Sequence, residues 1–371
     1  MAKTFTIEDL KYMQSQPLWW KIQKSVTKIY EWYKYWEGNI HISFSGGKDS
    51  TVLLDLCDKA AELYNTPLYP MVFVDTGLEY PEIRMFVKSF GSRVTWLKPE
   101  HTFKYVLNTY GYPVVNKITA QLIEAYRDYM DVTTKKGAKS LAYKLNGMFV
   151  NGNPSFVYRD RFSRWRFLVN APFKISDKCC NILKKTPLIN YEKQTNSKPI
   201  IGVMATESRN RKNNYLARGC NAFNGSQIQS NPLGFWTEDD ILEYLYITKI
   251  PYCSIYGDIL CSNSSTEYLN LYPEANNTPL TLKQSKNKAY SCTGVNRTGC
   301  MFCLFGLASE LKSKKSDRFT RMAKTHPKQY KYCMEVLKLQ EVIDYVHTNA
   351  PKEIIELPLI PGSDYSQPST T

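Results

Sequence analysis

A short apolar run, a glycine-containing turn and an amphipathic helix follow one another between residues 39 and 64. Residues 39–44 have the pattern of a buried strand, and residues 51–56 open a helix that we expect to end near Tyr64. Between them stands Ser45-Gly46-Gly47-Lys48-Asp49-Ser50. Two glycines let the backbone bend tightly and approach an anion, and a helix N-terminus offers unpaired N–H groups and a positive dipole end. The stretch therefore predicts a phosphate cradle, to which Lys48 adds a charge and Ser45 and Ser50 add hydroxyl donors.

Further strands and helices alternate along the chain after this stretch. Apolar runs at 69–77, 93–97 and 199–205 have the pattern of buried strands, and residues 81–87 and 103–110 have the pattern of helices. This alternation predicts an α/β fold with a doubly wound parallel sheet. Ligands of such sheets bind at the carboxyl ends of the strands, which is where Ser45–Ser50 and Asp75–Gly77 fall.

The chain of 371 residues is long enough for one large domain or two modest ones. We expect an N-terminal helical segment over residues 1–37 and a nucleotide-binding α/β domain over 38–250. A helical, cysteine-containing C-terminal region then covers 251–350, and a tail covers 351–371.

Composition and charge limit the partners that the chain can have. No apolar run approaches the length of a membrane span and the N-terminus carries no signal-like apolar stretch, so we expect a cytoplasmic protein without a membrane partner. The formal net charge is +14, from 48 basic and 34 acidic residues. Such a charge suits a polyanion such as nucleic acid, although a lysine-rich solvated surface would give the same number.

The glycine-containing stretch has neither the spacing of a Walker A loop nor that of a dinucleotide-binding turn. It resembles the Ser-Gly-Gly-x-Asp-Ser motif of the PP-loop ATP pyrophosphatases. Over residues 38–348 the chain resembles the PAPS reductase family of that superfamily. The matching segments are Ser43–Ser50, Val74–Gly77, Glu79–Glu82, Tyr110–Pro113, Cys179–Cys180, Glu207–Ser208 with Arg211, Pro232–Ile241, and the cysteines around Cys300.

This resemblance implies an adenine nucleotide, either ATP or PAPS/APS, as ligand. The residues that it implies for nucleotide binding are Ser43, Ser45, Gly46, Gly47, Lys48, Asp49, Ser50, Asp75, Thr76, Gly77, Glu207, Ser208 and Arg211. A carboxylate such as that of Glu207 needs a cation beside phosphate, and Mg²⁺ bridging the phosphates would supply one.

Cysteines form a second pattern, in which Cys300 and Cys303 make a Cys-x-x-Cys pair and Cys292 stands eight residues upstream. With the adjacent pair Cys179 and Cys180, the arrangement resembles the [4Fe–4S] ligands of assimilatory APS reductases. The Cys292–Cys303 run is also similar to DndC, the sulfur-transfer component of DNA phosphorothioation. Structural zinc, a metal-free redox pair and inert buried thiols are the alternatives. Which of the upstream cysteines bind the metal stays open, and Cys292 is either a ligand or a sulfur carrier.

Sulfonucleotide reductases carry a cysteine in a short motif near the C-terminus, and here no cysteine follows Cys333. We therefore favour ATP-dependent sulfur transfer, by adenylation and then thiolation, with nucleic acid as the acceptor. Lys48, Asp49 and Cys292 are the catalytic candidates, and a sulfur donor such as a cysteine desulfurase is the expected protein partner. The alternatives are a reductase of PAPS or APS, a relative of the ATP sulfurylase small subunit, and a nucleotide-binding regulator without turnover.

Overall fold

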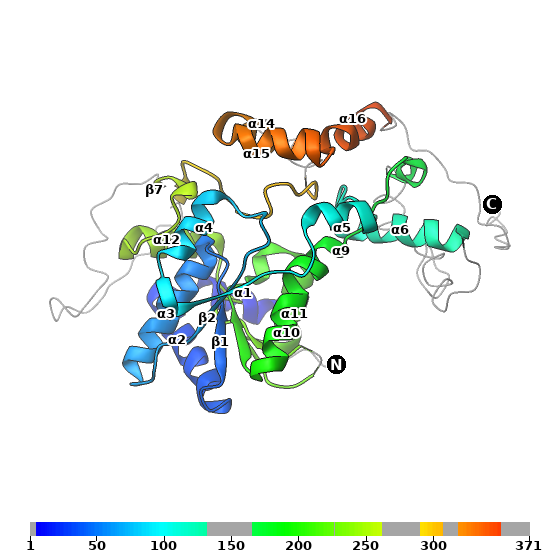
Figure 1. Ribbon diagram of the computed structural model, residues 1–371. Coiled ribbons are helices and arrows are strands. Elements are labelled where there is room, and N and C mark those ends of the chain that lie inside the picture. The colour runs from blue at the N-terminus through cyan, green and yellow to red at the C-terminus, as the bar shows by residue number, and fades with distance from the viewer. Residues whose placement is uncertain (1–4, 132–164, 226, 262–289, 307–317, 350–371) are drawn as a thin grey trace, which may run out of the picture. The chain divides into compact units, whose positions relative to one another are not determined.

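The computed structural model describes residues 5–131, 165–225, 227–261, 290–306 and 318–349 (Figure 1). The tail expected over residues 351–371 lies outside them. The chain divides into two compact units, and each unit combines two separate stretches of sequence. Unit 1 consists of Met1–Pro99 and Thr186–Cys300, and unit 2 consists of Glu100–Lys185 and Met301–Thr371.

A six-stranded sheet forms the centre of unit 1, with the strand order β3-β2-β1-β4-β6-β5. The strands are β1 (Ile40–Ser43), β2 (Met71–Val74), β3 (Val94–Leu97), β4 (Lys198–Ile201), β5 (Asn221–Ala222) and β6 (Gln229–Ser230). All neighbouring pairs are parallel except β5 with β6. The predicted doubly wound α/β fold is confirmed, and β1 lies inside the sheet with β2 on one side and β4 on the other.

The helices of unit 1 separate these strands along the chain. They are α1 (Ile7–Ser15), α2 (Leu18–Tyr35), α3 (Lys48–Leu63), α4 (Pro81–Lys88), α10 (Thr186–Thr195), α11 (Arg209–Arg218) and α12 (Glu238–Thr248). Helix α3 packs against both α2 and α12. It can do so because its side chains at positions 52, 53, 56 and 60 recur at helical spacing and are fully buried.

The N-terminal helices are held to the rest of unit 1 by buried polar contacts. The ammonium group of Lys21 on α2 lies 2.7 Å from both carboxylate oxygens of Asp240 on α12, and both residues are buried. Ser25 donates to the carbonyl of Pro232 and accepts from the indole of Trp236, each at 2.9 Å. Residues 7–35 therefore contribute directly to the core of this unit.

A two-stranded antiparallel sheet also belongs to unit 1. It pairs β7 (Ile259–Cys261) with β8 (Tyr290–Cys292), and Ile259 stands opposite Cys292. The sequence patterns did not indicate these strands, because neither stretch has the length or alternation of a typical strand. The pair contacts α12 and so places Cys292 near the first turn of that helix.

The described part of unit 2 is mostly helical. The α-helices described there are α5 (Phe103–Tyr110), α6 (Lys117–Asp131), α9 (Lys178–Cys180), α14 (Arg318–Thr325), α15 (Pro327–Lys331) and α16 (Leu339–Asn349). Inside the unit, the guanidinium of Arg127 donates to four backbone carbonyls between residues 168 and 173. The hydroxyl of Tyr112 donates to the carbonyl of Leu337 at 3.1 Å, which ties the two stretches of this unit together.

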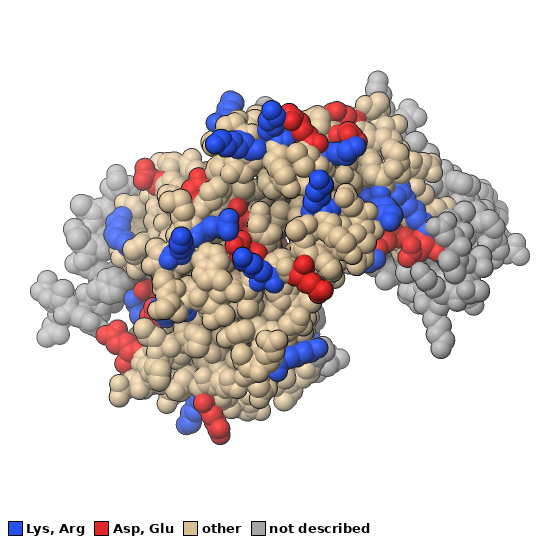
Figure 2. All heavy atoms as spheres, viewed as in Figure 1, with Lys and Arg blue, Asp and Glu red and all other residues tan. Residues whose placement is uncertain are grey.

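Basic and acidic side chains are interspersed on the face that Figure 2 shows, with wide uncharged areas between them. On that face the described residues do not gather the positive charge of the chain into one continuous patch. Among the helices that the structure describes, none is long and apolar enough to cross a membrane.

Candidate functional site

The candidate site lies in unit 1, where two loops leave adjacent strands at the same edge of the sheet. Strands β1 and β4 run parallel, and their last residues, Ser43 and Ile201, stand opposite one another. From β1 the chain continues to β2 and β3 on one side, whereas from β4 it continues to β5 and β6 on the other. This reversal of strand order is the position at which open α/β sheets bind ligands. The site therefore has two walls, which are the loop after β1 (residues 44–47) and the loop after β4 (residues 202–208).

Residues 45–50, which we call the glycine loop, fold tightly upon themselves. Gly46 has a φ of +70°, and a Cβ there would lie 2.8 Å from Val87 Cγ2 and 2.9 Å from Ile83 Cγ2. The hydroxyls of Ser45 and Ser50 share a hydrogen bond at 3.0 Å, and Ser50 also donates to the carbonyl of Gly47 at 2.9 Å. The loop is thus held in shape before any ligand arrives, and glycine is required at position 46 for both conformation and space.

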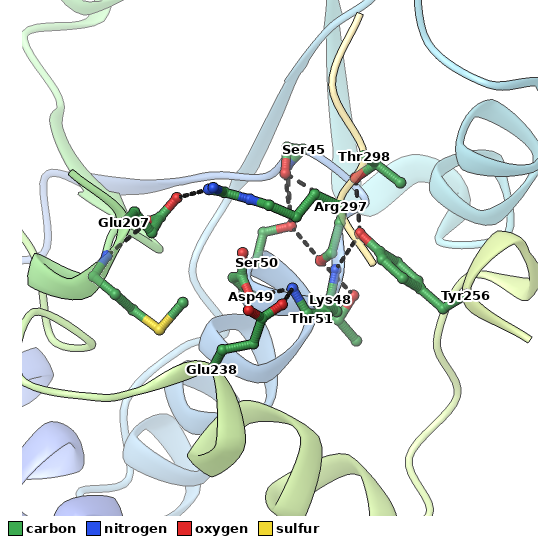
Figure 3. A network of polar contacts seen from close by, with 12 residues as sticks. Ser45, Lys48, Asp49, Ser50, Thr51, Glu207, Glu238, Tyr256, Arg297 and Thr298 are labelled. Carbon is green, nitrogen blue, oxygen red and sulfur yellow. Dashed lines mark hydrogen bonds and ion pairs between the residues drawn. The ribbon is translucent and has the colours of Figure 1, made fainter. Parts of the chain in front are cut away.

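The first residue of α3 makes the most informative contact of this loop. The amide of Lys48 donates to the hydroxyl of Tyr256 at 3.0 Å, and that hydroxyl shares a hydrogen bond with Thr298 Oγ1 at 2.7 Å (Figure 3). A Cβ on Gly47 would lie 3.1 Å from Thr298 Oγ1 and 3.2 Å from the Tyr256 hydroxyl. The end of the segment between Cys292 and Cys300 therefore touches the glycine loop directly.

The side chain of Lys48 is only 3% exposed and lies between two carboxylates. Its ammonium nitrogen is 3.4 Å from Asp49 Oδ1 and 3.1 Å from Glu238 Oε1, at the start of α12. Burial raises the pKa of Asp49, the charge of Lys48 opposes that rise, and the carboxylate of Glu207 adds to it. Asp49 is consequently a carboxyl group whose proton affinity depends on which cations surround it.

Glu207 carries the second cluster of charge. It ends the short helical turn Ala205–Glu207 after β4, and its side chain is 9% exposed. One of its oxygens accepts from the amide of Met204 at 2.9 Å. The other pairs with the guanidinium groups of both Arg211 and Arg297. The hydroxyl of Ser208 caps α11 by accepting from the amide of Arg211 at 3.2 Å. This contact fixes the start of α11 and so places Arg211 in its first turn.

The turn after β2 is stabilised internally. Asp75 is buried, accepts from the amide of Gly77 at 3.2 Å and pairs with Arg84 at 2.7 Å. The amide and the hydroxyl of Thr76 both donate to the carboxylate of Glu79. These contacts give the turn a fixed shape next to the loop of the neighbouring strand.

The predicted thiols are divided between the two units. Cys292 and Cys300 belong to unit 1, and Cys179, Cys180 and Cys303 belong to unit 2. Within the described ranges, no three histidine, cysteine, aspartate or glutamate side chains lie close enough together to hold a metal ion.

Two of the thiols have altered acidity. Burial raises the pKa of Cys292, and the charge of Lys48 partly opposes that rise, so this thiol lies within electrostatic reach of the glycine loop. A hydrogen bond from Cys179 lowers the pKa of Cys180 to about 6, and the charges of Lys117 and Lys184 act in the same direction.

The structure brings together most residues predicted for nucleotide binding, from the loops after β1 and β4. It also adds four residues that sequence reasoning missed, namely Glu238, Tyr256, Arg297 and Thr298. The sequence carried one usable signal, because Arg297 and Thr298 stand directly before Gly299-Cys300. The Cys-x-x-Cys spacing that follows them favours thiol chemistry instead and gives no sign of a contact with the glycine loop.

Comparison with known proteins identifies a family model that matches most of the chain. Residues 39–140 and 116–305 match the family model described as phosphoadenosine phosphosulfate reductase domain. An uncharacterized protein of Methanocaldococcus jannaschii is 25% identical over 261 residues, which are 67% of this chain and 48% of that protein. The chain therefore spans about half the length of this curated relative.

Solved structures with partial similarity come from two yeasts. The phosphate complex of phosphoadenylyl-sulfate reductase from Candida auris is 13% identical, with a TM-score of 0.34, and the match covers 68% of this chain and 92% of that one. The ATP complex of FMN adenylyltransferase from Candida glabrata is 14% identical, with a TM-score of 0.35, and covers 66% and 63%.

Proposed function

Because the chain belongs to the phosphoadenosine phosphosulfate reductase domain family, we propose that it is an enzyme that binds ATP in the glycine loop and uses it for sulfur transfer. The observation that carries this proposal is the position of the glycine loop. It joins β1 to the N-terminus of α3 at the reversal of strand order, and Glu207 on the neighbouring loop holds two arginines beside it. That combination suits a polyphosphate, which needs backbone N–H donors and cations at one sheet edge.

The reaction would proceed in two displacements. An oxygen of the acceptor attacks the α-phosphorus of ATP, the bond to the bridging oxygen breaks, and pyrophosphate leaves with its electron pair. A cysteine desulfurase or similar donor protein passes a persulfide sulfur to Cys292, whose outer sulfur attacks the activated carbon, so that the C–O bond breaks and AMP leaves. A second thiol then cleaves the remaining S–S bond, which releases the thiolated acceptor and leaves a disulfide. ATP enters as its Mg²⁺ complex, so the ion is part of the substrate. The chain's own residues hold the phosphates in line and stabilise the charge of the leaving pyrophosphate.

Named residues support separate parts of this proposal. Lys48 places a buried ammonium group inside the first turn of α3, and Asp49 is a half-buried carboxyl group beside it. The charge of Lys48 acts on the thiol of Cys292, and we favour Cys292 as the sulfur carrier. Nucleic acid is the proposed acceptor, and the support for it is the net charge of +14. The face in Figure 2 adds no single basic patch to that support.

The experiment is a pyrophosphate-release assay with purified protein, ATP and Mg²⁺, with and without bulk RNA or DNA. Release that depends on nucleic acid and is lost in Asp49→Asn supports the proposal. The exposed residue Lys59 offers a control, and Lys59→Ala retains the release. Binding of ATP without any release would favour a nucleotide-binding regulator. Sulfite released from PAPS or APS with a thiol would overturn the transferase in favour of a reductase, which the family name makes the second candidate.

The five predicted metal ligands form a separate proposal. Two of these five cysteines, Cys300 and Cys303, have Cys-x-x-Cys spacing, which supports an iron–sulfur cluster as the bound group and zinc as the lesser alternative. Protein purified without oxygen should contain about four irons and four sulfides per chain, lost in Cys300→Ala/Cys303→Ala. One zinc without sulfide would replace the cluster by a structural metal, and neither metal would leave these residues as thiols.

A further inference from the structure

Two arginines from distant parts of the sequence share one carboxylate at the edge of the glycine loop. Arg211 comes from the first turn of α11, and Arg297 comes from the segment between Cys292 and Cys300. Both pair with the same oxygen of Glu207. Figure 3 shows the side chain of Arg297 extending across the loop to reach that carboxylate.

The charges of this cluster do not cancel. Two guanidinium groups and one carboxylate leave one positive charge in excess. The Glu207 side chain is 9% exposed, whereas those of Arg211 and Arg297 are 41% and 59% exposed. The carboxylate is thus the buried anchor, and each arginine keeps N–H donors directed to solvent, since a guanidinium carries five donors and one carboxylate oxygen uses few of them.

Arg297 also lies within electrostatic reach of the glycine loop. Its charge lowers the pKa of Asp49, against the rise caused by burial. The next residue, Thr298, shares a hydrogen bond with Tyr256, whose hydroxyl accepts from the amide of Lys48. The segment that precedes Cys300 therefore contacts both walls of the site, the loop after β1 through Thr298 and the loop after β4 through Arg297.

We propose that Arg297 binds the terminal phosphates of the nucleotide, together with Arg211, and that Glu207 positions both arginines for this contact. Polyphosphate oxygens match the forked geometry of guanidinium groups better than a single carboxylate oxygen shared by two of them. The identity of the bound anion rests on the function proposed above, whereas the contact itself requires only a polyphosphate. The segment between Cys292 and Cys300 then contributes a phosphate ligand. One stretch of chain therefore carries both a phosphate contact and two thiols.

The test compares Arg297→Gln and Arg297→Lys with a matched control, Arg209→Gln. Arg209 is an exposed arginine on the same helix as Arg211, so its loss removes the same charge without removing a contact to Glu207. Isothermal titration calorimetry measures the affinity of each variant for ATP, AMP and inorganic pyrophosphate. We expect Arg297→Gln to lower the affinity for ATP and for pyrophosphate by about tenfold to a hundredfold, which is the effect of losing a charged hydrogen bond. The affinity for AMP should change by less than about threefold. Arg297→Lys should recover part of the loss.

Two readouts separate this contact from a structural role. The affinity for pyrophosphate should depend less on salt in Arg297→Gln than in the wild type, because one cation has left the binding site. Pyrophosphate should also slow the alkylation of Cys292 or Cys300 in the wild type and have less effect in Arg297→Gln.

The outcomes are distinguishable from those of the proposed function. Equal weakening of AMP and ATP, or unchanged affinity for pyrophosphate, overturns the role of Arg297 while leaving nucleotide binding intact. Absence of ATP and pyrophosphate binding in the folded wild type, as judged by circular dichroism, overturns both. Glu207→Gln keeps the shape of the side chain and should lower the affinity for pyrophosphate and ATP but not the affinity for AMP. Lower affinity for all three ligands would assign Glu207 a purely structural role.

Discussion

The amide of Lys48 donates a hydrogen bond to the hydroxyl of Tyr256, which lies 208 positions further along the chain. Helix N-termini normally leave such amides for water, a capping side chain or a ligand. Here Gly47 precedes the helix and offers no side chain, so a distant phenol takes that role. Burial raises the pKa of Tyr256, which keeps its hydroxyl protonated near neutral pH.

Replacing Tyr256 by phenylalanine should lower the free energy of unfolding by about 1–2 kcal/mol, because the amide of Lys48 and the hydroxyl of Thr298 both lose a partner. Urea denaturation measures the change. The solvent-exposed Tyr12 provides the control, since Tyr12→Phe removes a hydroxyl that faces water. Equal stability of Tyr256→Phe and the wild type would contradict a structural role for this contact.

Gly46→Ala should disrupt the glycine loop. The substitution combines a left-handed backbone, at about 1–2 kcal/mol, with a Cβ that meets Ile83 and Val87 at less than 3 Å. Gly91→Ala is the matched control, because Gly91 has a similar φ of +59° with nothing within 4 Å of its Cβ position. Chemical denaturation should therefore show that Gly46→Ala lowers the free energy of unfolding more than Gly91→Ala does. Similar losses at the two positions would mean that the contacts with α4 carry no penalty.

His41 should make the protein less stable in mild acid. It is fully buried on β1, its Nδ1 lies 2.8 Å from Ser197 Oγ, and burial lowers its pKa from 6.5 to about 4. The unfolded chain therefore binds a proton that the folded chain excludes, so this contribution is complete above pH 6.5 and is lost as the pH falls toward 4. Between pH 7 and pH 5 we expect a loss of about 2 kcal/mol in urea denaturation. His41→Leu should flatten this part of the profile, and His101→Gln should leave it unchanged.

Lys48→Met should be strongly destabilising because it removes a buried ammonium group and leaves the half-buried carboxyl of Asp49 without its cation. The cost should fall in an Asp49→Asn background, with a coupling free energy of about 1–3 kcal/mol in a double-mutant cycle. Lys59 and Asp55 form a more exposed pair on the same helix at 2.9 Å, and Lys59→Met should cost about 0.5 kcal/mol or less. Additive effects at positions 48 and 49 would refute the coupling.

Local patterns were sufficient to predict the elements that frame the site. The apolar runs at 39–44 and 69–77 became β1 and β2, and the helical patterns at 81–87 and 103–110 became α4 and α5. These features depend on neighbours in the sequence, so the sequence alone determines them.

Contacts between distant residues could not be predicted in the same way. Nothing near Tyr256 in the sequence indicates that its hydroxyl would meet α3, and the burial of Lys48 depends on Glu238 from another helix. The pairing of Arg297 with Glu207 likewise depends on how a loop at the end of unit 1 returns to the sheet. Local propensity and periodicity contain no information about such returns.

The strand order also determines when the site can form during protein synthesis. Strand β1 and the glycine loop emerge from the ribosome early, but β4, which pairs with β1, follows more than 150 residues later. Arg297 and Thr298 come later still, after all of residues 100–185 of unit 2 have been made. A nascent chain therefore carries the glycine loop with one strand neighbour missing while more than 150 further residues are made, and it completes the anion site only near the end of unit 1.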